Sequence, residues 1–169
     1  MKTSRDGAPL RLPASSVIRS EADLAHPELR ALYSFWKDRA GDRRAPSRND
    51  FDVLELKQWL PHLQLLDVLD DLSDVRYRVI GTWIAEFYGK DDTGKTFAEI
   101  GLNEQRRRVL SEFLTAAASM TPQAVTRPFY GQNEVKEHLL AERIILPLTT
   151  DGRRCDKLLS GIYTLAKNP

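Results

Sequence analysis

Three histidines are the side chains in this 169-residue chain most able to bind a metal ion: His26, His62 and His138. No two of them have a short spacing such as His-x-x-x-His, which places two imidazoles on one face of a helix. A metal site would therefore need ligands from distant segments, and none is expected. We expect His26 to flank the start of a helix and His138 to lie at the surface. His62 opens a strand, where it either meets a ligand or hydrogen-bonds the end of a helix.

The single cysteine, Cys155, excludes an intrachain disulfide and any metal site built from several cysteines. Arg153 and Arg154 precede it, and positive charge of this kind lowers the pKa of a thiol and favours the reactive thiolate. A structural cysteine at the entrance to a strand is the simpler interpretation, and a redox switch is the alternative.

No arrangement of residues in the sequence indicates catalysis. The motifs Gly-x-Ser-x-Gly and His-Glu-x-x-His are missing, and no Gly-rich loop is suited to binding phosphate. The acidic pairs at 70–71 and 91–92 lie in turn sequences, where aspartate is favoured for backbone reasons. Basic residues cluster at 106–108 and between 39 and 48, but no aromatic platform or recognition-helix pattern accompanies them. We therefore expect neither an enzyme nor a nucleic-acid-binding protein.

The overall charge and hydropathy of the chain point to a soluble protein. Lysine and arginine number 25 against 24 aspartates and glutamates, so the net charge of +1 gives no attraction to nucleic acid or an anionic membrane. No stretch approaches the roughly 18 apolar residues that a membrane helix needs. The N-terminus has no apolar segment typical of a signal peptide. A cytoplasmic location without membrane insertion is expected.

The first 60 residues divide into an arm and a helical extension. Residues 1–24 show no clear periodicity and are expected to form a mobile arm. Within residues 25–60, a helix is predicted from Pro27 to about Arg39, and a second short helix is predicted over 51–59. Four apolar side chains form a stripe along the first helix: Leu29, Leu32, Tyr33 and Trp36. A stripe of this size outside a minimal fold predicts an association surface, most simply that of a homodimer.

Residues 61–169 contain the pattern of a sheet interrupted by helices. Two strand-like segments at 63–68 and 75–79 form a hairpin, and the second alternates apolar and basic residues. A short helix at 82–88 and a longer one after Asn103 follow. Three further strands are predicted at 124–130, 137–148 and 155–166, with turns at 131–133 and 150–152. This order predicts an α+β fold with a five-stranded antiparallel sheet and helices on one face.

Several short motifs support that fold in order along the chain: Pro46-Ser47-Arg48, Leu60-Pro61-His62-Leu63, Tyr77-Arg78-Val79-Ile80-Gly81-Thr82, Phe87-Tyr88-Gly89-Lys90-Asp91 and Thr93-Gly94-Lys95. Together they resemble a bacterial PAS family found mainly in alphaproteobacteria, over roughly residues 28–165. The resemblance implies a PAS sensor or adaptor domain that is often the only recognisable domain of its protein. It implies no catalytic residue.

The best-known cofactors of PAS domains are not expected in this chain. Haem-binding PAS domains usually supply an axial histidine from a central helix, but no histidine lies between Thr82 and Ala118. In flavin-binding light sensors the reactive cysteine lies on a helix, whereas Cys155 lies in a hairpin. We therefore expect no haem, flavin or structural metal.

The remaining candidate for a site is a cavity between the sheet and the helices. Large side chains are expected to line it: Tyr77, Trp83, Phe87, Phe97, Phe113 and Tyr163. Aromatic residues at such positions more often fill a solid core than contact a ligand. The leading hypothesis is a non-enzymatic sensory or regulatory module that contacts an unknown signalling protein and is biased by a small apolar ligand. The alternatives are a small enzyme or carrier on a cone-shaped α+β fold, and a ligand-free interaction scaffold.

Overall fold

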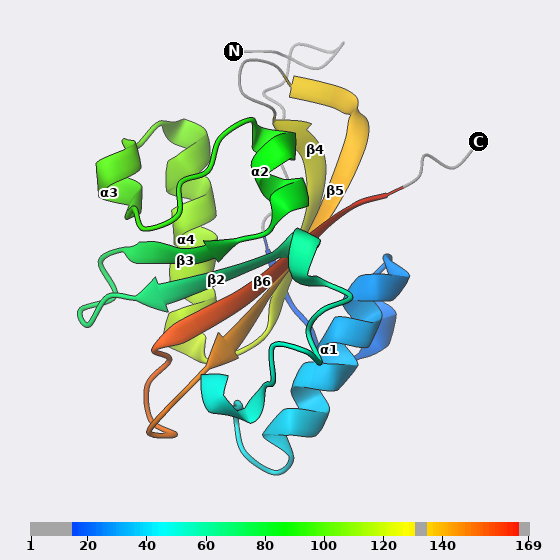
Figure 1. Ribbon diagram of the computed structural model, residues 1–169, viewed down its shortest axis with the longest axis vertical. Helices are drawn as coiled ribbons and strands as arrows, with labels where there is room; N and C mark the ends of the chain where they lie inside the picture. The colour runs from blue at the N-terminus through cyan, green and yellow to red at the C-terminus, as the bar shows by residue number, and fades with distance from the viewer. Residues whose placement is uncertain (1–14, 131–134, 166–169) are drawn as a thin grey trace.

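The computed structural model describes residues 15–130 and 135–165, which form one antiparallel sheet with four α-helices (Figure 1). The strand order is β1-β4-β5-β6-β2-β3. The strands are β1 Ser16–Val17, β2 Leu63–Val68, β3 Val75–Ile80, β4 Gln123–Tyr130, β5 Val135–Leu148 and β6 Lys157–Leu165. The predicted α+β fold is confirmed. The five long strands are those expected, and β1 adds a short sixth strand at one edge.

The central strand β6 shows how the two faces of the sheet are used. Successive residues of a strand point to opposite faces. Ile162 pairs with Arg143 of β5, whose guanidinium lies over Phe113 of the helix α4 (Glu104–Ser119). Gly161, which precedes Ile162 in β6, instead faces Leu29 of the helix α1 (Pro27–Ala40). We call the face toward α4 the inner face and the face toward α1 the outer face.

The helices α2 (Thr82–Tyr88), α3 (Phe97–Ile100) and α4 lie on the inner side, and in Figure 1 α1 lies apart from these three. Phe113, Ala116 and Ala117 of α4 are buried against the sheet. No helix in residues 15–130 and 135–165 is both long and apolar enough to cross a membrane.

The helix α1 begins and ends where the sequence predicts. Pro27 occupies its first turn, the side chain of His26 accepts a hydrogen bond from the Glu28 amide, and Gly41 ends it with φ of 57°. Because Gly161 has no side chain, the methyl groups of Leu29 and Leu32 approach the sheet closely. A Cβ atom at position 161 would lie only 3.0 Å from Leu29 Cδ2.

The prediction that the α1 stripe is an exposed association surface is wrong. Leu29 and Leu32 are 0% exposed, and Tyr33 and Trp36 are each 5% exposed. The indole of Trp36 also donates a hydrogen bond of 2.8 Å to the Pro147 carbonyl of β5. The stripe is therefore the part of the core that covers the outer face of the sheet.

The prediction of a mobile arm does not hold for the described residues 15–24, because two of them are packed in the core. The amide of Ile18 donates to the Pro122 carbonyl at 3.0 Å, and Ile18 and Leu24 are buried. Residues 1–14 of the predicted arm lie outside the described residues. The helical extension of residues 25–60 shares one core with the sheet.

The buried carboxylate of Glu142 fixes the start of α1 to strand β5. Its two oxygens accept hydrogen bonds of 2.8 Å from the backbone amides of Ala25 and His26. Glu142 is 3% exposed and points to the outer face. Because charge-assisted hydrogen bonds are strong, this contact holds the first turn of the helix against the sheet.

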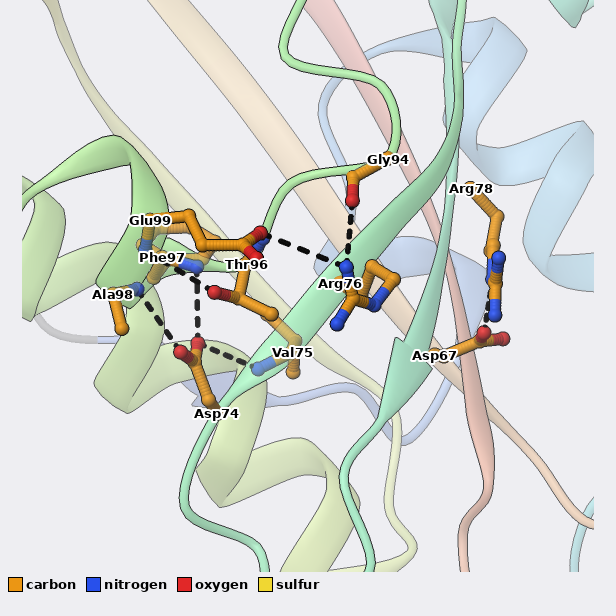
Figure 2. A network of polar contacts seen from close by, with 10 residues as sticks. All are labelled: Asp67, Asp74, Val75, Arg76, Arg78, Gly94, Thr96, Phe97, Ala98 and Glu99. Atoms are coloured by element: carbon orange, nitrogen blue, oxygen red, sulfur yellow. Dashed lines mark hydrogen bonds and ion pairs between the residues drawn. The ribbon is translucent and has the colours of Figure 1, made fainter.

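A second buried carboxylate, Asp74, joins β3 to α3 (Figure 2). It accepts hydrogen bonds from the amides of Val75, Phe97 and Ala98 at 2.7, 3.1 and 3.0 Å. The connection before α3 also covers the edge of β3, because Gly94 and Lys95 exchange backbone hydrogen bonds with Tyr77. These contacts set the position of the segment that closes one end of the inner cavity described below.

A candidate ligand cavity on the inner face

A cavity of about 360 Å³ lies between the inner face of the sheet and the helices α2, α3 and α4. Its walls come from every one of these elements. They include Gln64 of β2, Tyr77 of β3, Ile84 and Tyr88 of α2, Phe97 of α3, Val109 of α4 and Arg143 of β5. The volume falls within the range of about 300–1,000 Å³ that is usual for small-molecule sites.

The six aromatic residues expected to line the cavity divide into three groups. Tyr77 and Phe97 line it. Phe113 is fully buried behind it, in edge-to-face contact with Phe97 at a centroid distance of 6.0 Å. The other three, Trp83, Phe87 and Tyr163, are not among its lining residues.

The geometry of α2 and β6 explains why these three residues lie elsewhere. On α2, Ile84 and Tyr88 are four residues apart and share the side that faces the cavity. Trp83 and Phe87 share the neighbouring side, where their rings stack at 4.4 Å. On β6, Tyr163 alternates with Ile162 and therefore points to the outer face.

The cavity contains polar groups that are almost completely buried. Arg143 is 8% exposed, and its Nη2 donates to the Tyr88 hydroxyl at 3.3 Å. Gln64 is 3% exposed. Within the described part of the chain, Arg143 Nε and Gln64 Oε1 have no hydrogen-bond partner. Buried polar groups in proteins are normally paired, so these atoms indicate an interaction that the protein alone does not supply.

Tyr77 is a hydrogen-bonding group at the wall of the cavity. Burial raises the pKa of its phenol, and the positive charge of Arg143 offsets only part of that effect. The hydroxyl therefore stays protonated at neutral pH and is able to donate a hydrogen bond.

A stack of rings connects α2 with the start of α1 along the outside of the cavity. Centroid distances along it are 4.3 Å from His26 to Tyr163, 3.9 Å from Tyr163 to His62, 4.4 Å from His62 to Trp83 and 4.4 Å from Trp83 to Phe87. We call these five residues the ring stack. His62 is also fixed by its Nδ1, which lies 2.9 Å from the Ile162 carbonyl of β6. Its expected hydrogen bond to a helix end is thus made to a strand instead.

The His26 end of the ring stack should make stability depend on pH. Burial lowers the pKa of His26, against the opposing charges of Glu142 and Glu28. The unfolded chain therefore binds a proton first as the pH falls below about 6.5, and the free energy of unfolding decreases. A proton on His26 Nδ1 would also remove the acceptor for the Glu28 amide.

The substitution His26→Asn tests this dependence, because asparagine is a good helix cap that does not titrate. We expect denaturant unfolding of the wild type to show a loss of stability as the pH falls below about 6.5, and a smaller loss in His26→Asn. Identical pH profiles for the two proteins would show that His26 makes no contribution.

Cys155 has the structural role favoured from the sequence. It is 7% exposed, and its Sγ contacts the Lys157 carbonyl at 3.1 Å. Burial raises the pKa of the thiol to about 12, so the neighbouring arginines do not produce a thiolate. No group of three or more potential metal ligands occurs among the residues with described positions. The side chain of His138 lies outside the described residues.

The polar lining of the cavity was not predicted from the sequence. Gln64 lies between Leu63 and Leu65 in β2, and Arg143 follows Glu142 just before the apolar segment 144–146. Charged residues inside a predicted central strand are the signal that could have found Arg143. Because neighbouring residues of a strand point to opposite faces, Glu142 and Arg143 indicate one buried charge on each face of the sheet. Both are buried in the structure.

The fold and the cavity agree with a comparison against known families. A family model described as a PAS domain matches residues 24–164. This chain belongs to the PAS domain family. PAS domains are sensory and regulatory modules, typically without catalytic activity, and they commonly act through dimerisation or other protein contacts. No curated protein and no solved structure matches this PAS domain.

Proposed function

We propose that this PAS domain is a non-catalytic regulatory module that binds a small molecule in its inner cavity. The observation that supports the proposal is the cavity itself. Its walls combine apolar side chains, with Ile84, Phe97 and Val109 among them, and polar groups, two of which are buried and lack a partner in the described part of the chain. This combination is typical of small-molecule sites.

The cavity offers less support for an enzyme or a ligand-free scaffold. The raised pKa of Tyr77 is the opposite of what a general base requires. Asp92, a carboxylate that lines the cavity, is engaged by Lys90 at 2.9 Å and by Lys95 at 3.6 Å. A ligand-free scaffold would not need a cavity of about 360 Å³ between the sheet and the helices.

The ring stack provides a route from the cavity to the surface. Helix α2 has Ile84 and Tyr88 on its cavity side and Trp83 and Phe87 on its ring-stack side. A ligand that favours one position of α2 would therefore also favour one arrangement of His62, Tyr163 and the start of α1. A partner protein that contacts this region would respond to occupancy of the cavity. A signalling partner, a homodimer, a cytoplasmic location and a bacterial origin stay predictions.

Filling the cavity tests the proposed function. Val109→Trp would place an indole in the space, whereas Trp83→Phe alters a ring outside it. We would measure thermal unfolding of the wild type and both variants with a panel of small amphiphilic molecules of six to ten carbon atoms. A ligand at 100 times its Kd stabilises the folded state by about 2.7 kcal/mol, which corresponds to roughly 5–10 °C for a chain of this size.

We expect at least one member of the panel to raise the melting temperature of the wild type and of Trp83→Phe. The same molecule should have no effect on Val109→Trp. An equal shift in Val109→Trp would place the binding site elsewhere and contradict the proposal.

A further inference from the structure

Arg143 is a buried cation without a carboxylate partner in the described part of the chain. Its guanidinium lies 5.3 Å from the centroid of the Phe113 ring and contacts the hydroxyl of Tyr88. No ion pair joins it to any acidic residue whose side chain is described. Removing a guanidinium from water without an opposite charge is costly.

Three other charged side chains in the described part of the chain have partners, in contrast to Arg143. Glu112 forms a buried ion pair with Arg127, and Glu142 accepts two backbone hydrogen bonds. Asp67, on the outer face, is paired with both Arg78 and Lys157. These three carboxylates are therefore compensated by groups of the chain itself.

The charges around the cavity also favour an anion. Arg106, Lys90 and Arg143 line it, and Asp92 is a lining carboxylate whose two oxygens already face Lys90 and Lys95. Arg143 Nε has no hydrogen-bond partner in the described part of the chain. The protonated hydroxyl of Tyr77 is a second donor at this wall, and the charge of Arg143 acts on its pKa. Together they form a set of donors at one wall of the cavity, which also has an apolar part made by Ile84, Phe97 and Val109.

We propose that the cavity takes a small monocarboxylate with an apolar body, whose carboxylate is held by Arg143. The planar guanidinium suits a carboxylate because it offers parallel N–H donors. The apolar body would pack among Ile84, Phe97 and Val109. This inference rests on the proposed function, since it names the chemical class of the ligand for the same cavity.

Matched acids and amides test the inference separately from the existence of the site. The probes are heptanoate against heptanamide and phenylacetate against phenylacetamide, with Kd measured by calorimetry at pH 7.5. We expect the wild type to bind at least one acid about tenfold or more tightly than its amide. Arg143→Gln should bring the acid to the affinity of the amide, and Arg143→Lys should keep part of the preference. Val109→Trp should lose both.

The outcomes distinguish the anion inference from the proposed binding site. Equal affinity of acid and amide in the wild type would overturn the anion inference, as expected of a cavity that simply holds water at Arg143, and would leave the binding site standing. Failure of every probe to bind the wild type would overturn both. If Arg143→Gln does not fold, the comparison of acid and amide in the wild type still decides the matter.

Discussion

Replacing Gly81 by alanine is expected to cost this PAS domain about 3 kcal/mol or more of folding free energy, because the new methyl group would collide with the backbone. An ideal Cβ atom at position 81 lies 2.2 Å from the Pro61 carbonyl oxygen and 2.3 Å from that of Leu60. These are main-chain atoms that no side-chain rotation moves. The Gly81 amide also donates to the Leu63 carbonyl at 2.7 Å, so separating the two segments breaks this contact. Denaturant unfolding measures the loss.

Two other glycines serve as controls for Gly81. Gly161→Ala would meet Leu29 Cδ2 at 3.0 Å and Leu32 Cδ2 at 3.1 Å, which are ends of flexible side chains and yield more readily. The new methyl group of Gly94→Ala would meet no atom within 4 Å. The only cost is the backbone strain of a non-glycine residue at φ of +89°, which is about 1–3 kcal/mol. We expect Gly81→Ala to be the least stable of the three. A Gly81→Ala protein as stable as Gly94→Ala would show that the close approach is not a constraint.

Replacing Glu142 by alanine is the second change expected to have a large effect. It leaves the amides of Ala25 and His26 without their acceptor at the start of α1. Each buried donor left without a partner costs about 1–3 kcal/mol, so we expect a total loss of about 2–4 kcal/mol. The helix should also separate from the outer face more often and expose Leu29 and Leu32.

Hydrogen exchange of the α1 amides, together with denaturant unfolding, measures this effect. Glu142→Gln is the matched control, because its single carbonyl oxygen keeps one of the two hydrogen bonds. Its loss of stability should fall between those of the wild type and Glu142→Ala. If α1 exchanges at the wild-type rate in Glu142→Ala, the carboxylate does not hold the helix to the sheet.

The local structure was predictable from the sequence where one physical signal dominated. The alternation of Val75, Tyr77 and Val79 with basic residues correctly predicted strand β3. Pro27 and Gly41 correctly marked the ends of α1. Both signals depend on the backbone of a few neighbouring residues, so they do not require knowledge of the tertiary structure.

Predictions that depended on the packing partner were less successful. The apolar stripe of α1 was recognised, but helical spacing does not say what covers it. Its partner is the outer face at Gly161, more than 120 residues away in the sequence. The helix predicted over 51–59 is a series of turns, because Asp52 accepts the Leu54 amide at 2.9 Å and Leu54 remains 76% exposed.

For the candidate site too, features set by neighbouring residues were predicted and features set by tertiary packing were not. Tyr77 was correctly assigned to the inner face from its alternation within β3. In the seven-residue helix α2, the sequence did not reveal which side faces the cavity, so Trp83 was assigned there in place of Ile84. Arg143 was not predicted, because only large aromatic side chains were expected to line the cavity, and a charge within a strand was not.

The central claim, that the inner cavity binds a small molecule, is tested most directly by locating a bound probe. Intermolecular nuclear Overhauser effects can be measured between the alkyl protons of heptanoate and the methyl groups of the protein. If heptanoate binds in the inner cavity, we expect contacts with the methyl groups of Ile84 and Val109 and none with the indole of Trp83. These contacts should be lost in Val109→Trp. Contacts confined to the ring stack or to the outer surface would contradict the central claim.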